Sequence, residues 1–83
     1  MTEIFTRRLC SGCHDLARAL EAAGVSYTEW DCDCVDGLAE WAFRGAPDPL
    51  PAVWVGGAWI APECEDAREL ARLAIEAAAE DRP

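Results

Sequence analysis

The sequence contains no lysine, one histidine and one methionine, and its seven arginines are outnumbered by sixteen acidic residues. The net charge of −9 disfavours nucleic acids and anionic membrane surfaces as partners, because both are negatively charged. No apolar run approaches the roughly 18 residues of a membrane span. The first residues lack the basic region and long apolar stretch of a secretory signal, so we expect a cytoplasmic protein.

The chain is long enough for one hydrophobic core and too short for two. Its 83 residues therefore predict a single domain over residues 1–83, which we expect to be a monomer. Apolar residues make up 52% of the chain, which favours a folded domain over a disordered one.

The pattern of apolar residues predicts the element order β-α-β-α-β-β-α. Runs of β-favouring residues indicate strands over residues 3–6, 26–31, 52–55 and 58–60. Helical spacing indicates helices over residues 11–23, over 36–44, and from Pro62 to the end of the apolar pattern. In the second helix we expect Leu38, Trp41 and Ala42 to face inward. Gly56 and Gly57 predict a tight hairpin between the last two strands.

The connections between the predicted strands determine their directions. A helical crossover makes the first two strands parallel, and the hairpin makes the last two antiparallel. We therefore expect an α/β fold with a four-stranded mixed sheet flanked by helices. The first, second and fourth strands would run the same way, so the segments that follow them would lie at one edge of the sheet. Every cysteine falls in such a segment: Cys10, Cys13, Cys32, Cys34 and Cys64.

The first cysteine pair has the spacing of a redox motif. Cys10 and Cys13 form a CxxC at the expected start of a helix, and Arg7 and Arg8 precede it closely. The helix dipole and the arginines would favour a thiolate at Cys10, and the thiolate is the reactive form of cysteine. We predict that Cys10 attacks a disulfide and that Cys13 then resolves the mixed disulfide.

Other chemistry is open to these cysteines. With His14 the motif reads CxxCH, a c-type haem attachment sequence, but Met1 is the only other residue that could supply a usual second axial ligand.

Cys32 and Cys34 could form a second redox pair or a thiolate site for zinc, copper or an iron–sulfur cluster, or they could pack as small apolar residues. A thiolate metal or iron–sulfur carrier on the same fold is thus the alternative function, although we expect no resident metal.

Nearly the whole chain resembles a glutaredoxin, a member of the thioredoxin-fold superfamily. The similarity is carried by "IFTRRLCSGC" followed by a helix, by "PLPAVWVGG", and by "WIAPECEDA". The family has Thr-Lys before its CxxC where this chain has Thr6-Arg7. The family's valine–proline with a cis peptide bond corresponds to Leu50-Pro51.

The resemblance implies a thiol–disulfide oxidoreductase with no tightly bound cofactor. Substrates would be a disulfide-bearing protein or a small thiol, with glutathione as a co-substrate. Arg7, Leu50 and Pro51 would line the substrate site. Cys64-Glu65-Asp66 corresponds to the segment that helps hold glutathione in the family, so Glu65 and Asp66 would contact the substrate. Cys32 and Cys34 are not part of the family pattern, and together with Cys64 they are candidate auxiliary thiols.

Overall fold

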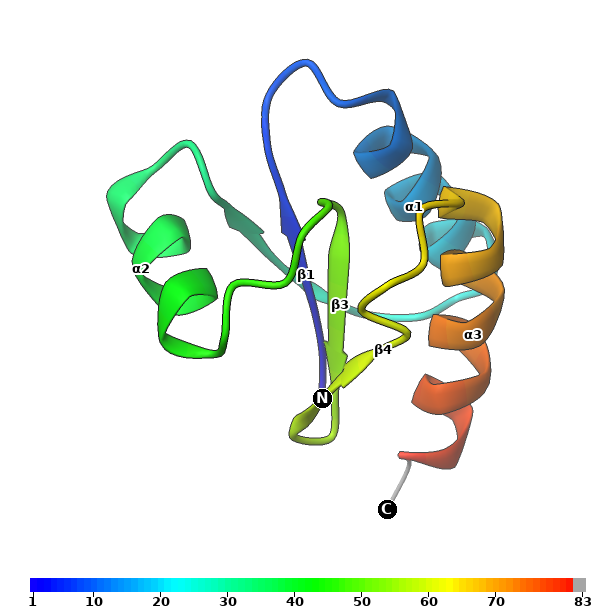
Figure 1. Ribbon diagram of the computed structural model, residues 1–83. Helices are drawn as coiled ribbons and strands as arrows, with labels where there is room; N and C mark the ends of the chain where they lie inside the picture. Colours follow the sequence, from blue (N-terminus) through cyan, green and yellow to red (C-terminus); the bar gives the residue numbers. More distant parts are fainter. Residues whose placement is uncertain (82–83) are drawn as a thin grey trace.

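The computed structural model describes residues 1–81 (Figure 1). Its elements are β1 (Thr2–Thr6), α1 (Ser11–Ala22), β2 (Thr28–Asp31), α2 (Val35–Phe43), β3 (Ala52–Val55), β4 (Ala58–Ile60) and α3 (Ala67–Glu80). This order confirms the predicted β-α-β-α-β-β-α arrangement. None of the helices in the described residues is long and apolar enough to cross a membrane.

The four strands form one mixed sheet in the order β2-β1-β3-β4. β1 runs parallel to β2 and antiparallel to β3, and β3 runs antiparallel to β4. These directions confirm the prediction that β1, β2 and β4 point the same way. Helices α1 and α3 cover one face of the sheet, and α2 lies on the other side of it (Figure 1).

Each face of the sheet has its own apolar cluster. Ile4 and Phe5 are adjacent and point to opposite faces, as alternation along a strand requires. The larger cluster joins the sheet to α1 and α3 and contains Ile4, Leu16, Leu20, Val53, Val55, Leu70, Ala71 and Ala74. The smaller one lies towards α2 and consists of Phe5, Cys32 and Ala52, with the four tryptophans packed against it.

The last helix begins later than the sequence pattern indicated. It starts at Ala67, whereas Pro62 lies in an irregular segment between β4 and α3. Ala61 adopts a positive φ of 42°, which turns the chain away from a helical path. Asp66 caps the helix, because its side chain accepts a hydrogen bond from the backbone N–H of Arg68.

The inward face predicted for the second helix is also partly wrong. Trp41 is half-buried, but Leu38 is 49% exposed and Ala42 is exposed. Gly37 faces the sheet instead, so close to the end of β2 that an added Cβ would lie 2.1 Å from the carbonyl oxygen of Asp31. The helix therefore packs through its backbone at this point, which turns several of its apolar side chains outward.

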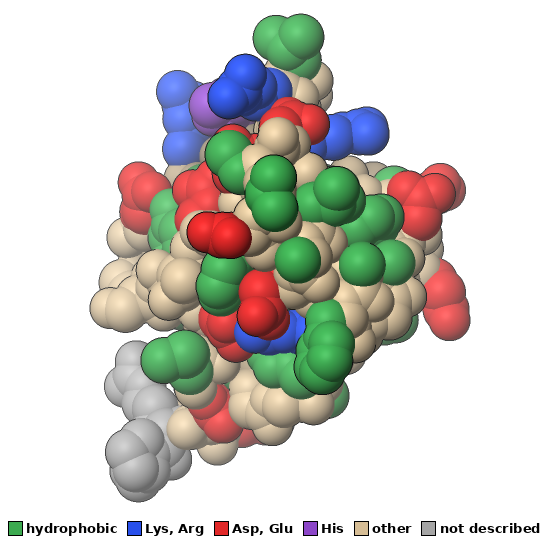
Figure 2. Space-filling model, turned by 90° about the vertical axis from the view of Figure 1, so that its left-hand side faces the viewer, with side chains coloured by type: hydrophobic (Ala, Val, Ile, Leu, Met, Phe, Trp, Pro, Cys, Tyr) green, Lys and Arg blue, Asp and Glu red, His purple; other side chains and the backbone are tan. Residues whose placement is uncertain are grey.

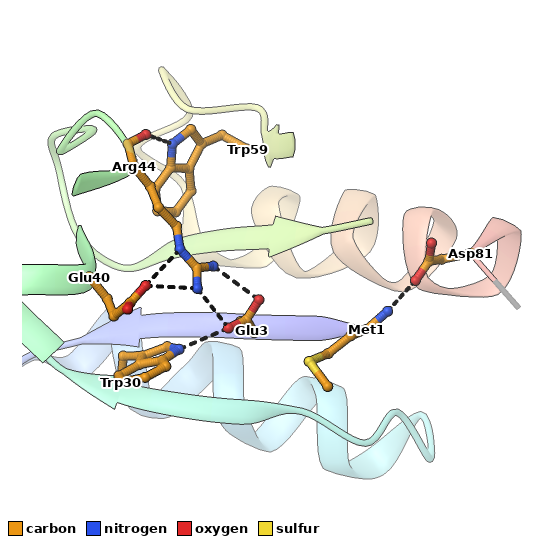
Figure 3. A network of polar contacts seen from close by, with 7 residues as sticks. All are labelled: Met1, Glu3, Trp30, Glu40, Arg44, Trp59 and Asp81. Carbon is orange, nitrogen blue, oxygen red and sulfur yellow. Dashed lines mark hydrogen bonds and ion pairs between the residues drawn. The ribbon is translucent and has the colours of Figure 1, made fainter. Parts of the chain in front are cut away.

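A polar network closes the side of the sheet beside α2 (Figure 3). The Arg44 guanidinium pairs with both carboxylate oxygens of Glu3, at 3.0 and 3.1 Å, and with Glu40. Trp30 donates to Glu3 at 3.0 Å, and Trp59 donates to the Arg44 carbonyl at 2.7 Å. The hydrogen bonds from Arg44 lower the pKa of Glu3 despite its partial burial. The network ties β1, β2 and β4 to the end of α2.

Candidate redox site

Cys10 and Cys13 form a disulfide at the beginning of α1, with their Cα atoms 5.3 Å apart. Cys10 is the N-cap residue, and its sulfur accepts a hydrogen bond of 3.1 Å from the backbone N–H of Cys13. The N-terminal N–H groups of a helix stabilise negative charge, so this position favours a thiolate once the pair is reduced. Cys10 is half-buried, whereas Cys13 is only 5% exposed. An incoming disulfide would therefore meet Cys10 first.

The loop before Cys10 is exposed and carries positive charge. Arg7, Arg8 and Leu9 are all exposed, and Leu9 adopts a positive φ of 53°. A left-handed conformation is uncommon for leucine and is held here by the surrounding loop. The backbone N–H of Arg8 donates to Asp33 at 2.6 Å, which joins this loop to the turn after β2. The arginines therefore stand beside the CxxC, as the sequence suggested.

The proline loop lies directly against the CxxC helix. A Cβ placed on Gly12 would lie 3.5 Å from Pro51 Cδ and 3.5 Å from Ala67 Cβ. The Leu50–Pro51 peptide bond is cis, and so is Asp48–Pro49. Leu50 is half-buried against the smaller apolar cluster. The start of α1, the proline loop and the start of α3 thus converge at one place.

Glu65 and Asp66, the predicted glutathione-binding residues, lie just before α3 and are exposed. Asp66 uses one carboxylate oxygen to cap the helix, as described above, so only its remaining acceptor capacity is available to a ligand. Cys64 was expected at the start of this helix, but it lies in the loop before it. Its thiol donates to the backbone carbonyl of Asp66 at 3.4 Å.

Cys32 and Cys34 follow β2, at the same sheet edge as Cys10, as the strand directions predicted. Cys32 is buried, and burial raises the pKa of its thiol, with Asp31 and Asp33 adding to the effect. Cys34 is exposed, but its thiol donates a hydrogen bond to Asp31, and this bond raises the pKa of Cys34. Both environments therefore favour the thiol over the thiolate.

The thiolate metal site receives no support from this arrangement. Within residues 1–81, no three side chains of His, Cys, Asp or Glu are grouped closely enough to hold a metal ion.

Sequence reasoning missed two residues that shape this edge. Asp31 controls the Cys34 thiol, and Asp33 holds the loop that precedes the CxxC. No sequence pattern pointed to either aspartate, because both roles depend on contacts with other residues.

Solved structures of other proteins are similar to this chain. No protein-family model and no curated protein matches the sequence. A mutant of the thioredoxin-like protein BC3987 superposes with a TM-score of 0.71 at 19% identity, covering 88% of this chain and 97% of that one. The glutaredoxin-like NrdH-redoxin from Escherichia coli, described as having a thioredoxin-like activity profile, gives 0.64 at 28% identity, covering 87% and 92%.

These similarities confirm the resemblance seen in the sequence. The chain has a thioredoxin-like α/β fold and is similar to glutaredoxin-like proteins. Cysteines at disulfide distance at the start of α1 support a redox function on this fold.

Proposed function

We propose that this protein is a small thiol–disulfide oxidoreductase that uses Cys10 and Cys13. The observation that carries the proposal is the Cys10–Cys13 disulfide at the N-terminus of α1, with the more accessible sulfur on the N-cap residue. The buried Cys13 is three residues away, close enough to attack a mixed disulfide at Cys10. The similarity to the glutaredoxin-like NrdH-redoxin, described as having a thioredoxin-like activity profile, supports the proposal.

The reaction is a two-step exchange that starts from the reduced protein. The Cys10 thiolate attacks one sulfur of a substrate disulfide, which forms a Cys10–substrate disulfide and releases the other substrate sulfur as a thiolate. Cys13 then loses its proton and attacks Cys10, which forms the Cys10–Cys13 disulfide and releases the second substrate thiolate. Solvent protonates both released sulfurs. A dithiol or two small thiols must return two electrons to the protein for the next cycle.

The surroundings of Cys10 indicate where a substrate would lie. Pro51 packs against Gly12, so the exposed part of Leu50 and Pro51 would flank a substrate bound at Cys10. Arg7 would attract an anionic group of the substrate. Glu65 and Asp66, just before α3, would contact another part of the same substrate. The substrate would be a protein disulfide or a small disulfide, with glutathione as a co-substrate. We propose the cytoplasm as the compartment, because reducing conditions there would recycle the pair.

A reductase assay with single cysteine variants tests this proposal. We expect the wild type to reduce a small aromatic disulfide catalytically when dithiothreitol supplies electrons. Cys10→Ser should abolish turnover. Cys13→Ser, mixed with the disulfide in the absence of dithiothreitol, should hold a mixed disulfide at Cys10 that mass spectrometry detects. Cys64→Ser is the matched control and should keep its rate, since its thiol bonds to the Asp66 carbonyl. Turnover that survives Cys10→Ser would contradict the proposal.

A further inference from the structure

The outward side of α2 carries several exposed apolar side chains. Val35 is 84% exposed, Phe43 is 89% exposed and Leu38 is half-exposed. We call this surface the α2 apolar face, and it consists of Val35, Leu38, Ala39, Ala42 and Phe43. Figure 2 views the molecule from this side and shows apolar side chains gathered across it.

The helical spacing of these residues places them on the same side of α2. Positions 35, 38, 39, 42 and 43 fall on one side of a helix, and none of them is charged. A surface helix usually turns such a stripe towards the core, but α2 packs on β2 through Gly37 and Trp41 instead. The fold therefore makes no use of the α2 apolar face, and an apolar patch left exposed in this way marks an interaction surface.

The α2 apolar face begins next to the edge of the sheet that carries Cys10 and Cys13. Its first residue, Val35, directly follows Cys34 and the turn after β2. Asp33 of that turn accepts a hydrogen bond from Arg8, the neighbour of the fully exposed Leu9. A protein bound across this junction would cover Leu9 and Val35 together and would bring its own disulfide to Cys10.

Acidic residues border the end of the face nearest the CxxC. Asp33 and Asp36 are exposed there, and Figure 2 shows acidic side chains between the apolar ones. The chain as a whole carries a net charge of −9. Beside Asp33 and Asp36, flanking lysines or arginines on an apolar segment would complement the charge better than acidic residues would.

A second copy of the chain fits the surface poorly. The face belongs to a helix of nine residues, which is about 13 Å long. Stable dimers bury about 1,200–2,000 Å² in total, more than one short helix offers. Two copies would also bring the same aspartates together. A redox partner needs only a transient contact that includes the CxxC edge, and such contacts are smaller.

We propose that the α2 apolar face is the docking surface for a protein substrate whose disulfide lies beside an apolar segment flanked by basic residues. This assignment rests on the proposed reductase function and names the substrate class for that site. Docking on α2 would raise the rate for such proteins without changing the rate for small disulfides.

Synthetic peptides provide a direct test. One probe carries an intramolecular cystine followed by a leucine-rich helical segment flanked by lysines. A second replaces the lysines with glutamates, and a third contains the cystine loop alone. Reduction is followed by mass spectrometry with dithiothreitol as donor. We expect kcat/KM for the lysine peptide to exceed that for the loop by about tenfold, and the glutamate peptide to stay near the loop.

Variants assign the effect to the α2 apolar face. The combined Val35→Gln, Leu38→Gln, Phe43→Gln variant should reduce the lysine peptide no faster than the loop peptide and should leave the loop rate unchanged. Ala22→Gln, an exposed helical position outside the face, is the matched control and should behave as wild type.

Several results would overturn the docking proposal. Equal lysine-peptide rates for the wild type and the combined variant would do so, and so would equal rates for the lysine and glutamate peptides. A wild-type dimer in sedimentation that the combined variant dissociates would assign the face to a second copy. In each of these cases, reduction of the loop peptide would still support the proposed reductase function. A wild-type protein that reduces none of the peptides would refute the reductase function itself.

Discussion

The reactivity of each cysteine depends on the charges and hydrogen bonds around its sulfur. Cys10 accepts a hydrogen bond from a helix N-terminal N–H, which stabilises a thiolate. Cys34 instead donates to a carboxylate, which stabilises the thiol, and Cys32 is buried. Cys34 is the most exposed of these cysteines, so exposure alone would make it the most reactive. The hydrogen bonds at the two sulfurs predict instead that Cys10 is the more reactive.

We predict that Cys10 is alkylated first when the reduced protein reacts with iodoacetamide at pH 7. Its pKa should lie below the free-cysteine value of about 8.5. Cys34 should react slowly at this pH despite its exposure, because its raised pKa keeps it protonated until the solution is well above neutral. Peptide mass spectrometry gives the order, and earlier modification of Cys13 or Cys34 would show that the roles are misassigned.

Asp31→Asn tests the cause of the Cys34 shift. The amide keeps the shape of the side chain but removes the negative charge that opposes a thiolate, so the pKa of Cys34 should fall and its alkylation at pH 8 should accelerate several-fold. Asp15→Asn, an exposed change on α1, is the control and should leave the rate as it is. An unchanged rate in Asp31→Asn would mean that the hydrogen bond to Asp31 does not govern this thiol.

The second cysteine pair is expected to be dispensable for the first. In reduced protein we predict free thiols at Cys32 and Cys34, and a Cys32→Ser, Cys34→Ser double variant should keep CxxC reductase activity to within about twofold. Metal analysis of anaerobically purified protein accompanies the assay. Stoichiometric zinc or iron that disappears in the double variant would instead favour a thiolate metal carrier.

At the scale of elements, the features set by local sequence were predictable. Apolar spacing defined α1, and the pair Gly56 and Gly57, with φ values of 58° and 95°, defined the hairpin. The CxxC was recognised from its local spacing, whereas Pro51 was identified through the resemblance to glutaredoxins. The orientation of α2 was not, because it depends on a backbone contact between Gly37 and β2 that only the assembled sheet creates.

That backbone contact gives a stability prediction. Gly37→Ala would push a methyl group into the Asp31 carbonyl and should lower the free energy of unfolding by about 1–3 kcal/mol, although alanine favours helix. Gly12→Ala is the matched control, since its methyl group would find ordinary contacts of 3.5 Å and should be tolerated. Urea unfolding monitored by circular dichroism compares them, and equal stability of the two variants would refute the contact.

In the molecule as a whole, Arg44 covers part of the sheet face on which α2 lies. It lies over the rings of Phe5 and Trp54, at 5.3 and 4.9 Å, while its guanidinium pairs with Glu3. The pair connects the first strand to the residue after α2, so it links distant parts of the chain.

This pair makes stability depend on pH in a defined direction. The folded-state pKa of Glu3 lies below its unfolded value of about 4.3. The pair therefore stabilises the folded protein above the unfolded pKa. This stabilisation is lost as the pH falls through the folded-state pKa. Glu3→Gln should therefore be less stable than wild type at pH 7 and approach it at pH 3. Glu69→Gln, in an exposed pair, should change little. A Glu3→Gln deficit that is the same at both pH values would contradict this assignment.

We infer that Cys10 and Cys13 form the disulfide that accepts and returns electrons. The most direct measurement is differential alkylation of the fully reduced wild-type protein before and after it reacts with one equivalent of a small disulfide, with every cysteine quantified by mass spectrometry. We predict complete conversion of Cys10 and Cys13 to one intramolecular disulfide while Cys32, Cys34 and Cys64 stay reduced. Oxidation of any other pair, with Cys10 left as a free thiol, would contradict the account.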